Sequence, residues 1–273
     1  MKSLRYEMRG VAYWMECANP FRRTVTARDL PLGLKIEGYK RDCVGRGLYR
    51  RGVHEPALTK FILDAFSGTR SGNGQARHFL DVGANIGYFS CLLGRLAGPE
   101  GSVMAVEPEL QNLQLLRRNL AENGLRNVTV YSCALGAEEG TARLGIYKAA
   151  NRGRHSLVDL ESCEKFIDVP VRRLDDLVRD SGIASWALLK LDVEGSEPFV
   201  FQGAAETLAK TEILAMEFSS SHWRSAGIEP AEVFRLLGAN FSRVHRFDGM
   251  TLTPINVVDC LKIESTTELV LQR

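Results

Sequence analysis

Short apolar runs alternate with amphipathic stretches over most of the chain after residue 77. Amphipathic stretches such as residues 109–124 place leucines on one helical face, at positions 110, 113, 116 and 120. Strand–helix alternation of this kind predicts a parallel, doubly wound α/β sheet. The five apolar runs of strand length occupy residues 78–84, 102–108, 128–135, 186–193 and 211–218.

Two parts of this main region depart from the alternation. Strand-like runs at residues 141–148 and 166–174 flank a polar stretch over 149–164, which we interpret as an irregular excursion. The final runs, at residues 241–248 and 267–273, have no helical pattern between them. They predict a last pair of strands forming an antiparallel edge of the sheet.

The first 75 residues have a different pattern. Residues 30–42 alternate enough to suggest a strand or hairpin, and residues 56–66 carry apolar positions at helical spacing. Residues 67–77 are rich in Gly and Ser and read as a loop or short linker. We therefore predict a small α+β extension over residues 1–75 and a main domain over residues 76–273.

Composition narrows the class of protein. The net charge of +2 argues against a dedicated nucleic-acid binder. Basic pairs at residues 22–23, 40–41 and 50–51 fit either a solvated surface or a docking face for an anionic substrate or a membrane.

The six cysteines are scattered without a C-x-x-C pair, which fits a reducing compartment. The sequence shows no apolar run of membrane-spanning length and no leader pattern, so we expect a cytoplasmic protein. Peripheral contact with a membrane and a homodimer are open options.

A glycine turn, DVGANIGYFS, follows the first strand of the main domain at residues 81–90. The dinucleotide pattern G-x-G-x-x-G would need glycines at 83, 85 and 88, but Asn85 and Tyr88 occupy two of these positions. No P-loop lysine follows either, so the ligand is not expected to be held through phosphates. Glu107 lies about twenty residues beyond Gly87, the spacing of a ribose-hydroxyl acceptor, and Asp81 adds a second carboxylate. A ribose-bearing, phosphate-free cation such as S-adenosylmethionine fits both acids.

Several motifs occur in a fixed order: DVGANIGYFS, VEP, CALGAEEG, VPVRRLDDL and LKLDVEGSEP. Together they resemble the FkbM-type family of S-adenosylmethionine-dependent methyltransferases, over roughly residues 45–218. The resemblance implies a Rossmann-like class I methyltransferase sheet, mostly parallel with an antiparallel last strand. It assigns the cofactor site to Asp81, Gly83, Asn85, Gly87, Glu107, Cys133, Ala134, Leu135 and Asp192.

Each of these residues also has a purely structural explanation. The glycines could serve a tight turn, Asp81 could cap a helix, and Glu107 could favour a helix dipole. Asp192 could be a turn residue before Gly195. Glu194 and Glu197 could favour the start of the next helix.

Methyl transfer to an alcohol needs alignment of the acceptor and removal of its proton. The candidates at the predicted strand ends are Asp192, Glu217 and His222. Asp192, Glu194 and Glu217 could together hold a magnesium ion, which prefers oxygen ligands. Arg154, His155 and Ser156 of the excursion could form a lid.

The sequence thus predicts an S-adenosylmethionine-dependent O-methyltransferase acting on a hydroxyl of a sugar, a glycan or a secondary metabolite. The basic N-terminal residues slightly favour an anionic or glycan acceptor. Three tryptophans could stack on a sugar ring, namely Trp14, Trp186 and Trp223, although Trp186 begins an apolar strand. Two alternatives stay open. One is a nicotinamide-dependent oxidoreductase, against which the turn spacing counts, and the other is a binding module of the same fold without activity.

Overall fold

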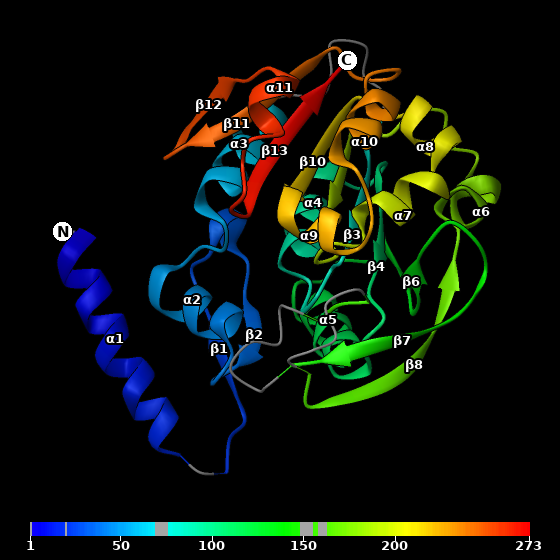
Figure 1. The fold of residues 1–273 in the computed structure, drawn as a ribbon. Coiled ribbons are helices and arrows are strands. Elements are labelled where there is room, and N and C mark those ends of the chain that lie inside the picture. The colour runs from blue at the N-terminus through cyan, green and yellow to red at the C-terminus, as the bar shows by residue number, and fades with distance from the viewer. Residues whose placement is uncertain (1, 20, 69–75, 148–154, 158–162) are drawn as a thin grey trace.

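The computed structural model describes residues 2–19, 21–68, 76–147, 155–157 and 163–273 (Figure 1). Its centre is an eight-stranded sheet in the order β12-β11-β13-β10-β9-β3-β4-β5. The five strands from β10 to β5 are parallel, and this confirms the predicted doubly wound sheet. The strands are β3 (His78–Val82), β4 (Ser102–Val106), β5 (Val128–Tyr131), β9 (Leu188–Leu191), β10 (Ile213–Phe218), β11 (Arg243–Asp248), β12 (Thr251–Pro254) and β13 (Thr267–Gln272).

The last strand is antiparallel as predicted, but its expected place at the edge was wrong. β13 pairs with β10 on one side and β11 on the other, and β12 forms the edge. The physical reason is that β11 pairs with the second edge of β13 and satisfies its backbone groups, while the burial of Leu269, Val270 and Leu271 shows that both faces of the strand are covered as well. A short helix, α11 (Val257–Cys260), separates β12 from β13.

Helices cover both faces of the sheet, as the alternation of strands and helices requires. One face packs on α3 (Pro56–Phe66), α4 (Tyr88–Ala97) and α5 (Leu110–Glu122), through alternate strand residues such as Phe79 and Val103. The other face, which includes Leu80 and Met104, packs on the later helices. These are α6 (Leu174–Val178), α7 (Glu197–Gln202), α8 (Ala205–Ala209), α9 (Ser220–Ser225), α10 (Pro230–Leu237) and α11.

The N-terminal segment contains two helices that the sequence pattern did not predict, α1 (Lys2–Ala18) and α2 (Cys43–Arg51). The predicted hairpin exists, but it pairs β1 (Thr24–Ala27) with β2 (Ile36–Tyr39) rather than lying within residues 30–42. Two side-chain amides at the end of α5 hold β2 and the residue before it: Asn119 of α5 forms hydrogen bonds with the backbone of Glu37, and Asn123, the C-cap of α5, with that of Lys35. The predicted boundary near residue 75 stays a prediction, since residues 69–75 lie outside the described part.

The excursion is partly regular. β6 (Ala134–Leu135), β7 (Gly140–Ile146) and β8 (Lys165–Arg172) form a second sheet, in which β7 and β8 are an antiparallel hairpin. Of the polar stretch between them, residues 155–157 and 163–164 are described, and Ser156 pairs with Gly145. This small sheet lies beyond the carboxyl ends of β4 and β5, next to the glycine turn (Figure 1).

Candidate active site

The glycine turn holds an unusual backbone. Gly83, Asn85 and Gly87 all have positive φ values, of +77°, +51° and +87°. A Cβ on Gly83 would lie 1.7 Å from the carbonyl oxygen of Asp192, and one on Gly87 would lie 2.3 Å from Leu116 Cδ1. Both glycines are therefore required by the packing of the turn on β9 and α5, as well as by their dihedral angles.

A cavity with an empty volume of about 610 Å³ opens above this turn, at the carboxyl ends of β3, β4 and β9. A ligand crevice is expected at this end of a parallel sheet. The structure brings seven of the nine predicted cofactor residues together in the cavity wall. Asp81 and Gly87 do not line it. The seven are Gly83, Asn85, Glu107, Cys133, Ala134, Leu135 and Asp192.

Glu107 is held in place by three donors. The backbone N–H groups of Asn85 and Glu109 donate to it at 2.9 and 3.0 Å, and the Asn112 side-chain amide lies at 3.4 Å. Burial raises the pKa of this carboxyl to about 7, although the hydrogen bonds oppose the shift. Its side chain is oriented towards the cavity before any ligand arrives, as a ribose acceptor needs to be.

Two further polar atoms of the wall have no hydrogen-bond partner among the described residues. They are Asn112 Oδ1 and Ser196 Oγ, on side chains that are both 2% exposed. A buried acceptor without a partner costs free energy unless a ligand or water satisfies it. The cavity therefore offers a carboxylate, an amide oxygen and a hydroxyl beside apolar Leu135 and Leu144, which suits an adenosine. Sequence reasoning missed Asn112, although its position five residues after Glu107, in the first turn of α5, was a usable signal.

Asp81 lies below the cavity and is fully buried. Ser90 donates to it at 2.5 Å, and its other oxygen has no partner among the described residues. Desolvation raises the pKa of Asp81, against the attraction of Lys190. Its predicted contact with a ligand cation stays a prediction.

Lys190 is a site residue that sequence reasoning did not single out. Its ammonium lies 3.1 Å from Asp192 Oδ2 and 3.4 Å from the carbonyl oxygen of Gly83, and the residue is 4% exposed. Although burial opposes it, the attraction of Asp192, Asp81 and Glu55 raises the Lys190 pKa, so the group stays charged. A lysine inside the otherwise apolar strand β9 was the signal in the sequence.

The turn after Asp192 is fixed by a buried carboxylate. Glu194 and Gly195 have φ values of +52° and +94°, and Glu197 Oε1 accepts the N–H groups of Val193 and Gly195, both at 3.2 Å. The indole N–H of Trp223 donates to Glu197 Oε2 at 3.0 Å. Glu197 therefore stabilises the loop that carries Asp192, a more specific role than an interaction with a helix dipole.

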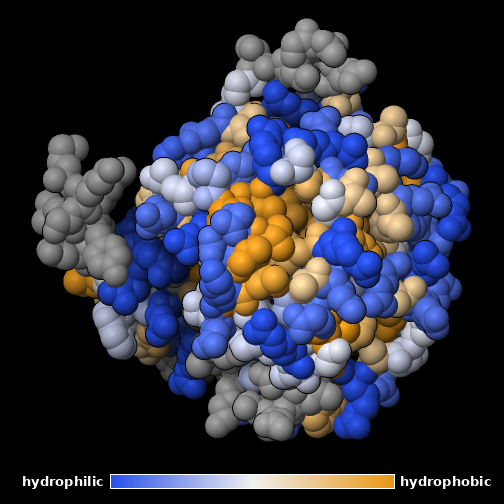
Figure 2. Space-filling model, turned by 45° about the horizontal axis from the view of Figure 1, so that its top comes forward, coloured by the Kyte–Doolittle hydropathy of each residue, from blue (hydrophilic) through white to orange (hydrophobic). Residues whose placement is uncertain are grey.

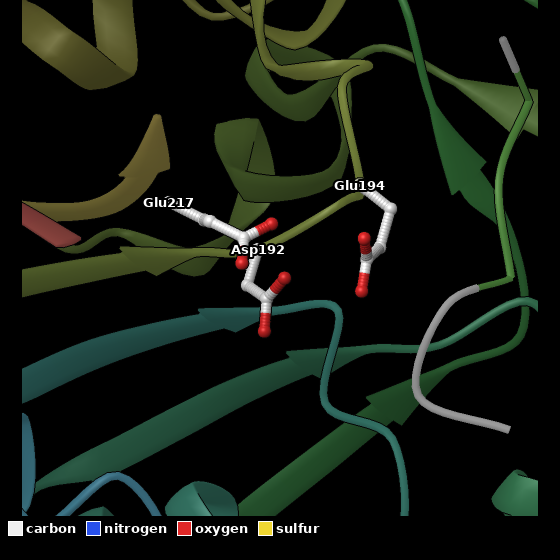
Figure 3. Close-up of side chains that lie close together, drawn as sticks. All are labelled: Asp192, Glu194 and Glu217. Atoms are coloured by element: carbon white, nitrogen blue, oxygen red, sulfur yellow. The ribbon is translucent and has the colours of Figure 1, made fainter. Parts of the chain in front are cut away.

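Asp192 and Glu194, from the loop after β9, and Glu217, from β10, lie close together (Figure 3). One carboxylate oxygen of each lies within 4.8 Å of the others. Lys190 already supplies a cation to Asp192, and magnesium is not supported by any other feature of the described residues.

A second cavity, with an empty volume of about 290 Å³, lies on the other side of Asp192. Its polar wall consists of Glu55, Lys190, Asp192, Glu217 and Glu268. Burial and the repulsion of neighbouring carboxylates raise the pKa of Glu217 to about 9 and that of Glu268 to about 8. Burial would raise the pKa of Glu55, but the attraction of two cations outweighs it and lowers this pKa to about 2. The cations are Lys190 and His54, whose ring nitrogen lies 3.0 Å from the Glu55 carboxylate. At neutral pH the wall thus combines ionised Glu55 with protonated Glu217 and Glu268.

The remaining predicted residues differ in their relation to these cavities. His222, on α9, is absent from both described walls. Of the proposed lid, His155 lines the first cavity and the Ser156 hydroxyl donates to the Glu194 carbonyl at 2.8 Å. Arg154 lies outside the described residues.

The sheet order and the glycine turn are those of the Rossmann-like class I methyltransferase fold, whose members use S-adenosylmethionine. The model of the methyltransferase FkbM domain matches residues 81–248, more than half of the chain. The chain therefore belongs to the FkbM methyltransferase family, and it is a methyltransferase.

Two sequence relatives agree with this assignment, and one solved structure is also similar. Methyltransferase sdnD of Sordaria araneosa is 30% identical over 180 residues, 55% of this chain and 68% of that protein. The 31-O-demethyl-FK506 methyltransferase FkbM of Streptomyces tacrolimicus is 31% identical over 154 residues, 46% of this chain and 58% of its own length. A crystal structure of methyltransferase FkbM from Methylobacillus flagellatus is 20% identical, with a TM-score of 0.46 over 82% of this chain and 49% of that one. The matched part thus spans little more than half of the FK506 enzyme.

Proposed function

We propose that the protein is an O-methyltransferase that transfers the methyl group of S-adenosylmethionine to a hydroxyl of a sugar, a glycan or a secondary metabolite. One observation carries the proposal: Asp192 lines both cavities. A donor in the first cavity and an acceptor in the second would meet at this residue. Alignment of two reactants across a shared wall is the main task of a methyltransferase.

Within the first cavity, Glu107 and Asn112 would hold the ribose, and Ala134 and Leu135 would pack against the adenine. Gly83 lets the backbone approach the ligand. When bound, S-adenosylmethionine supplies a methyl group already activated on a sulfonium.

Within the second cavity, Asp192 is the candidate for receiving the hydroxyl proton, because its carboxylate lies at the wall shared by both cavities. Glu217, with a pKa of about 9, holds its own proton at neutral pH and so would donate a hydrogen bond to the acceptor. His222 remains a less direct candidate, since it does not line the described wall.

The acceptor would be neutral or cationic. Three of the wall carboxyls, Glu55, Glu217 and Glu268, have only Lys190 and the nearby His54 as described cationic neighbours. Of these three, Glu55 is ionised at neutral pH and would repel an acceptor carrying a carboxylate or phosphate, whereas protonated Glu217 and Glu268 can donate hydrogen bonds to a neutral hydroxyl. The FK506 relative is named as a methyltransferase of 31-O-demethyl-FK506, which fits a hydroxyl acceptor. The family favours this function over a nicotinamide-dependent oxidoreductase.

A cytoplasmic location also belongs to this proposal. None of the six cysteines forms a disulfide, as expected in a reducing compartment. Among the described residues, no helix has the length and apolar character to cross a bilayer. The homodimer stays an untested option.

Calorimetric titration of S-adenosylmethionine and S-adenosylhomocysteine into the native chain and a Glu107→Ala variant tests the donor site. We expect micromolar binding to the native chain and a loss of about tenfold or more in the variant. Glu138→Gln, at an exposed position, is the control and should bind normally. Absence of binding to the native chain would contradict the proposal.

Transfer of a labelled methyl group to a panel of neutral, amino and carboxylated sugars then tests the acceptor. Labelling of neutral or amino sugars that disappears in Asp192→Asn supports the proposal. Labelling of carboxylated sugars alone would contradict the expected charge preference.

A further inference from the structure

Helix α1 exposes an apolar face. Val11, Trp14 and Met15, at i, i+3 and i+4 spacing, are 63%, 71% and 72% exposed, and Phe21 just beyond the helix is 94% exposed. The opposite side of α1 packs on the body through Tyr13, whose hydroxyl donates to the Lys40 carbonyl. Because α1 stands at one side of the molecule (Figure 1), its outer face is unpartnered among the described residues.

The same segment is strongly basic. Residues 1–51 contain twelve Lys and Arg against five Asp and Glu, a net charge of +7 in a chain whose total is only +2. Arg22 and Arg23 directly follow Phe21 and are both exposed, and Arg22 lies 3.4 Å from Glu16. Arg28, Arg41, Arg46 and Arg51 are exposed in the same segment. Figure 2 shows strongly hydrophilic atoms along the side of the molecule beside the grey atoms at its left edge.

Apolar side chains next to exposed cations fit one class of partner. Amphipathic helices with Trp and aliphatic residues on one side and basic residues nearby lie in the headgroup region of anionic bilayers. A second copy of the chain would bring two segments of charge +7 together, which is unfavourable. We propose that α1 and residues 21–23 dock this protein on an anionic lipid bilayer, with Val11, Trp14, Met15 and Phe21 in the interface and Arg22 and Arg23 at the phosphates.

This inference does not depend on the methyl acceptor. The docking face belongs to residues 11–23, whereas the two cavities are lined by residues from Glu55 onwards. Binding to lipid can therefore be measured without a substrate, and its failure would leave the proposed activity untouched.

The chain offers an internal probe. It has three tryptophans, and Trp186 and Trp223 are both 0% exposed, whereas Trp14 is 71% exposed. A blue shift of tryptophan emission on adding vesicles would therefore report Trp14 entering the interface. Trp14→Phe should lose the shift while retaining most of the binding.

The test uses the full chain with vesicles of phosphatidylcholine alone or with 30% phosphatidylglycerol, followed by fluorescence and co-sedimentation. We expect at least about tenfold tighter binding to the anionic vesicles, weakened at high salt. Arg22→Gln/Arg23→Gln should weaken it about tenfold or more. The matched control Arg126→Gln/Arg235→Gln removes two exposed cations elsewhere and should bind normally.

Apolar contacts are tested separately. Trp14→Ser/Met15→Ser should also lose binding, and Val258→Ser, at a position 64% exposed on α11, should not. All these positions are exposed, so unchanged thermal unfolding will show that the variants are folded. Equal affinity for both vesicles, no binding, or self-association that Trp14→Ser abolishes would each overturn the proposal.

Discussion

The carbonyl oxygen of Asp192 occupies the space that a side chain at Gly83 would need, since a Cβ there would lie 1.7 Å from it. The cofactor turn and the loop of the candidate catalytic residue are therefore in direct contact. A change in either one must move the other.

Gly83→Ala should consequently displace Asp192 and weaken S-adenosylhomocysteine binding by about 100-fold or more. A positive φ alone costs an alanine roughly 1 kcal/mol of conformational free energy, so the expected loss is larger than backbone strain would explain. Gly182→Ala is the matched control, because Gly182 also has a positive φ, of +67°, in the left-handed region and nothing lies within 4 Å of its Cβ position. Titration and thermal unfolding of both variants separate the clash from the backbone strain. Equal losses in the two would show that the contact with Asp192 is unimportant.

Cofactor binding should depend on pH through Glu107. Burial raises its pKa to about 7, and the ionised form is the one that accepts ribose hydroxyls. Affinity for S-adenosylhomocysteine should therefore rise as pH increases through 7, by about tenfold between pH 6 and pH 8. Calorimetry across this range measures the effect, and Glu107→Gln should bind more weakly with no such trend. The same pH trend in the variant would assign the titration to another group.

The bond between Trp223 and Glu197 should contribute to both stability and binding. Trp223→Phe removes the N–H and leaves a buried carboxylate oxygen unsatisfied, at a cost of about 1–3 kcal/mol in the free energy of unfolding. Cofactor affinity should fall as well, because Glu197 fixes the loop after Asp192. Trp14→Phe, at an exposed position, should change the unfolding free energy by less than about 0.5 kcal/mol. Urea unfolding of both variants checks this.

Glu217 should make the folded chain less stable at high pH. Its pKa of about 9 lies far above the value of about 4.3 expected in the unfolded chain, so the folded state binds more protons between these values. The free energy of unfolding therefore falls as pH rises from about 4.3 to about 9. Glu217→Gln should flatten this fall and raise the melting temperature at pH 9, by about 2–4 °C for each kcal/mol recovered. Exposed Glu232→Gln should follow the native profile.

Local patterns predicted much of this molecule. Strand–helix alternation identified the parallel sheet, and the spacing from Gly87 to Glu107 identified two parts of one site, because both depend on neighbours along the chain. Contacts between distant segments were not predictable in this way. Glu55 reaches Glu268 from more than 200 residues away, and β13 lies inside the sheet because the β11–β12 hairpin covers its other edge. Helix α1 was missed because much of its apolar surface faces outwards rather than into the core.

The two cavities draw on different parts of the chain. Every described residue of the first cavity lies within residues 81–248, the span that the family shares. The second takes Glu55 and Leu58 from before that span, and Glu268 and Leu269 from after it. Exchange of these flanking segments between relatives would therefore replace much of the acceptor wall and leave the donor wall intact.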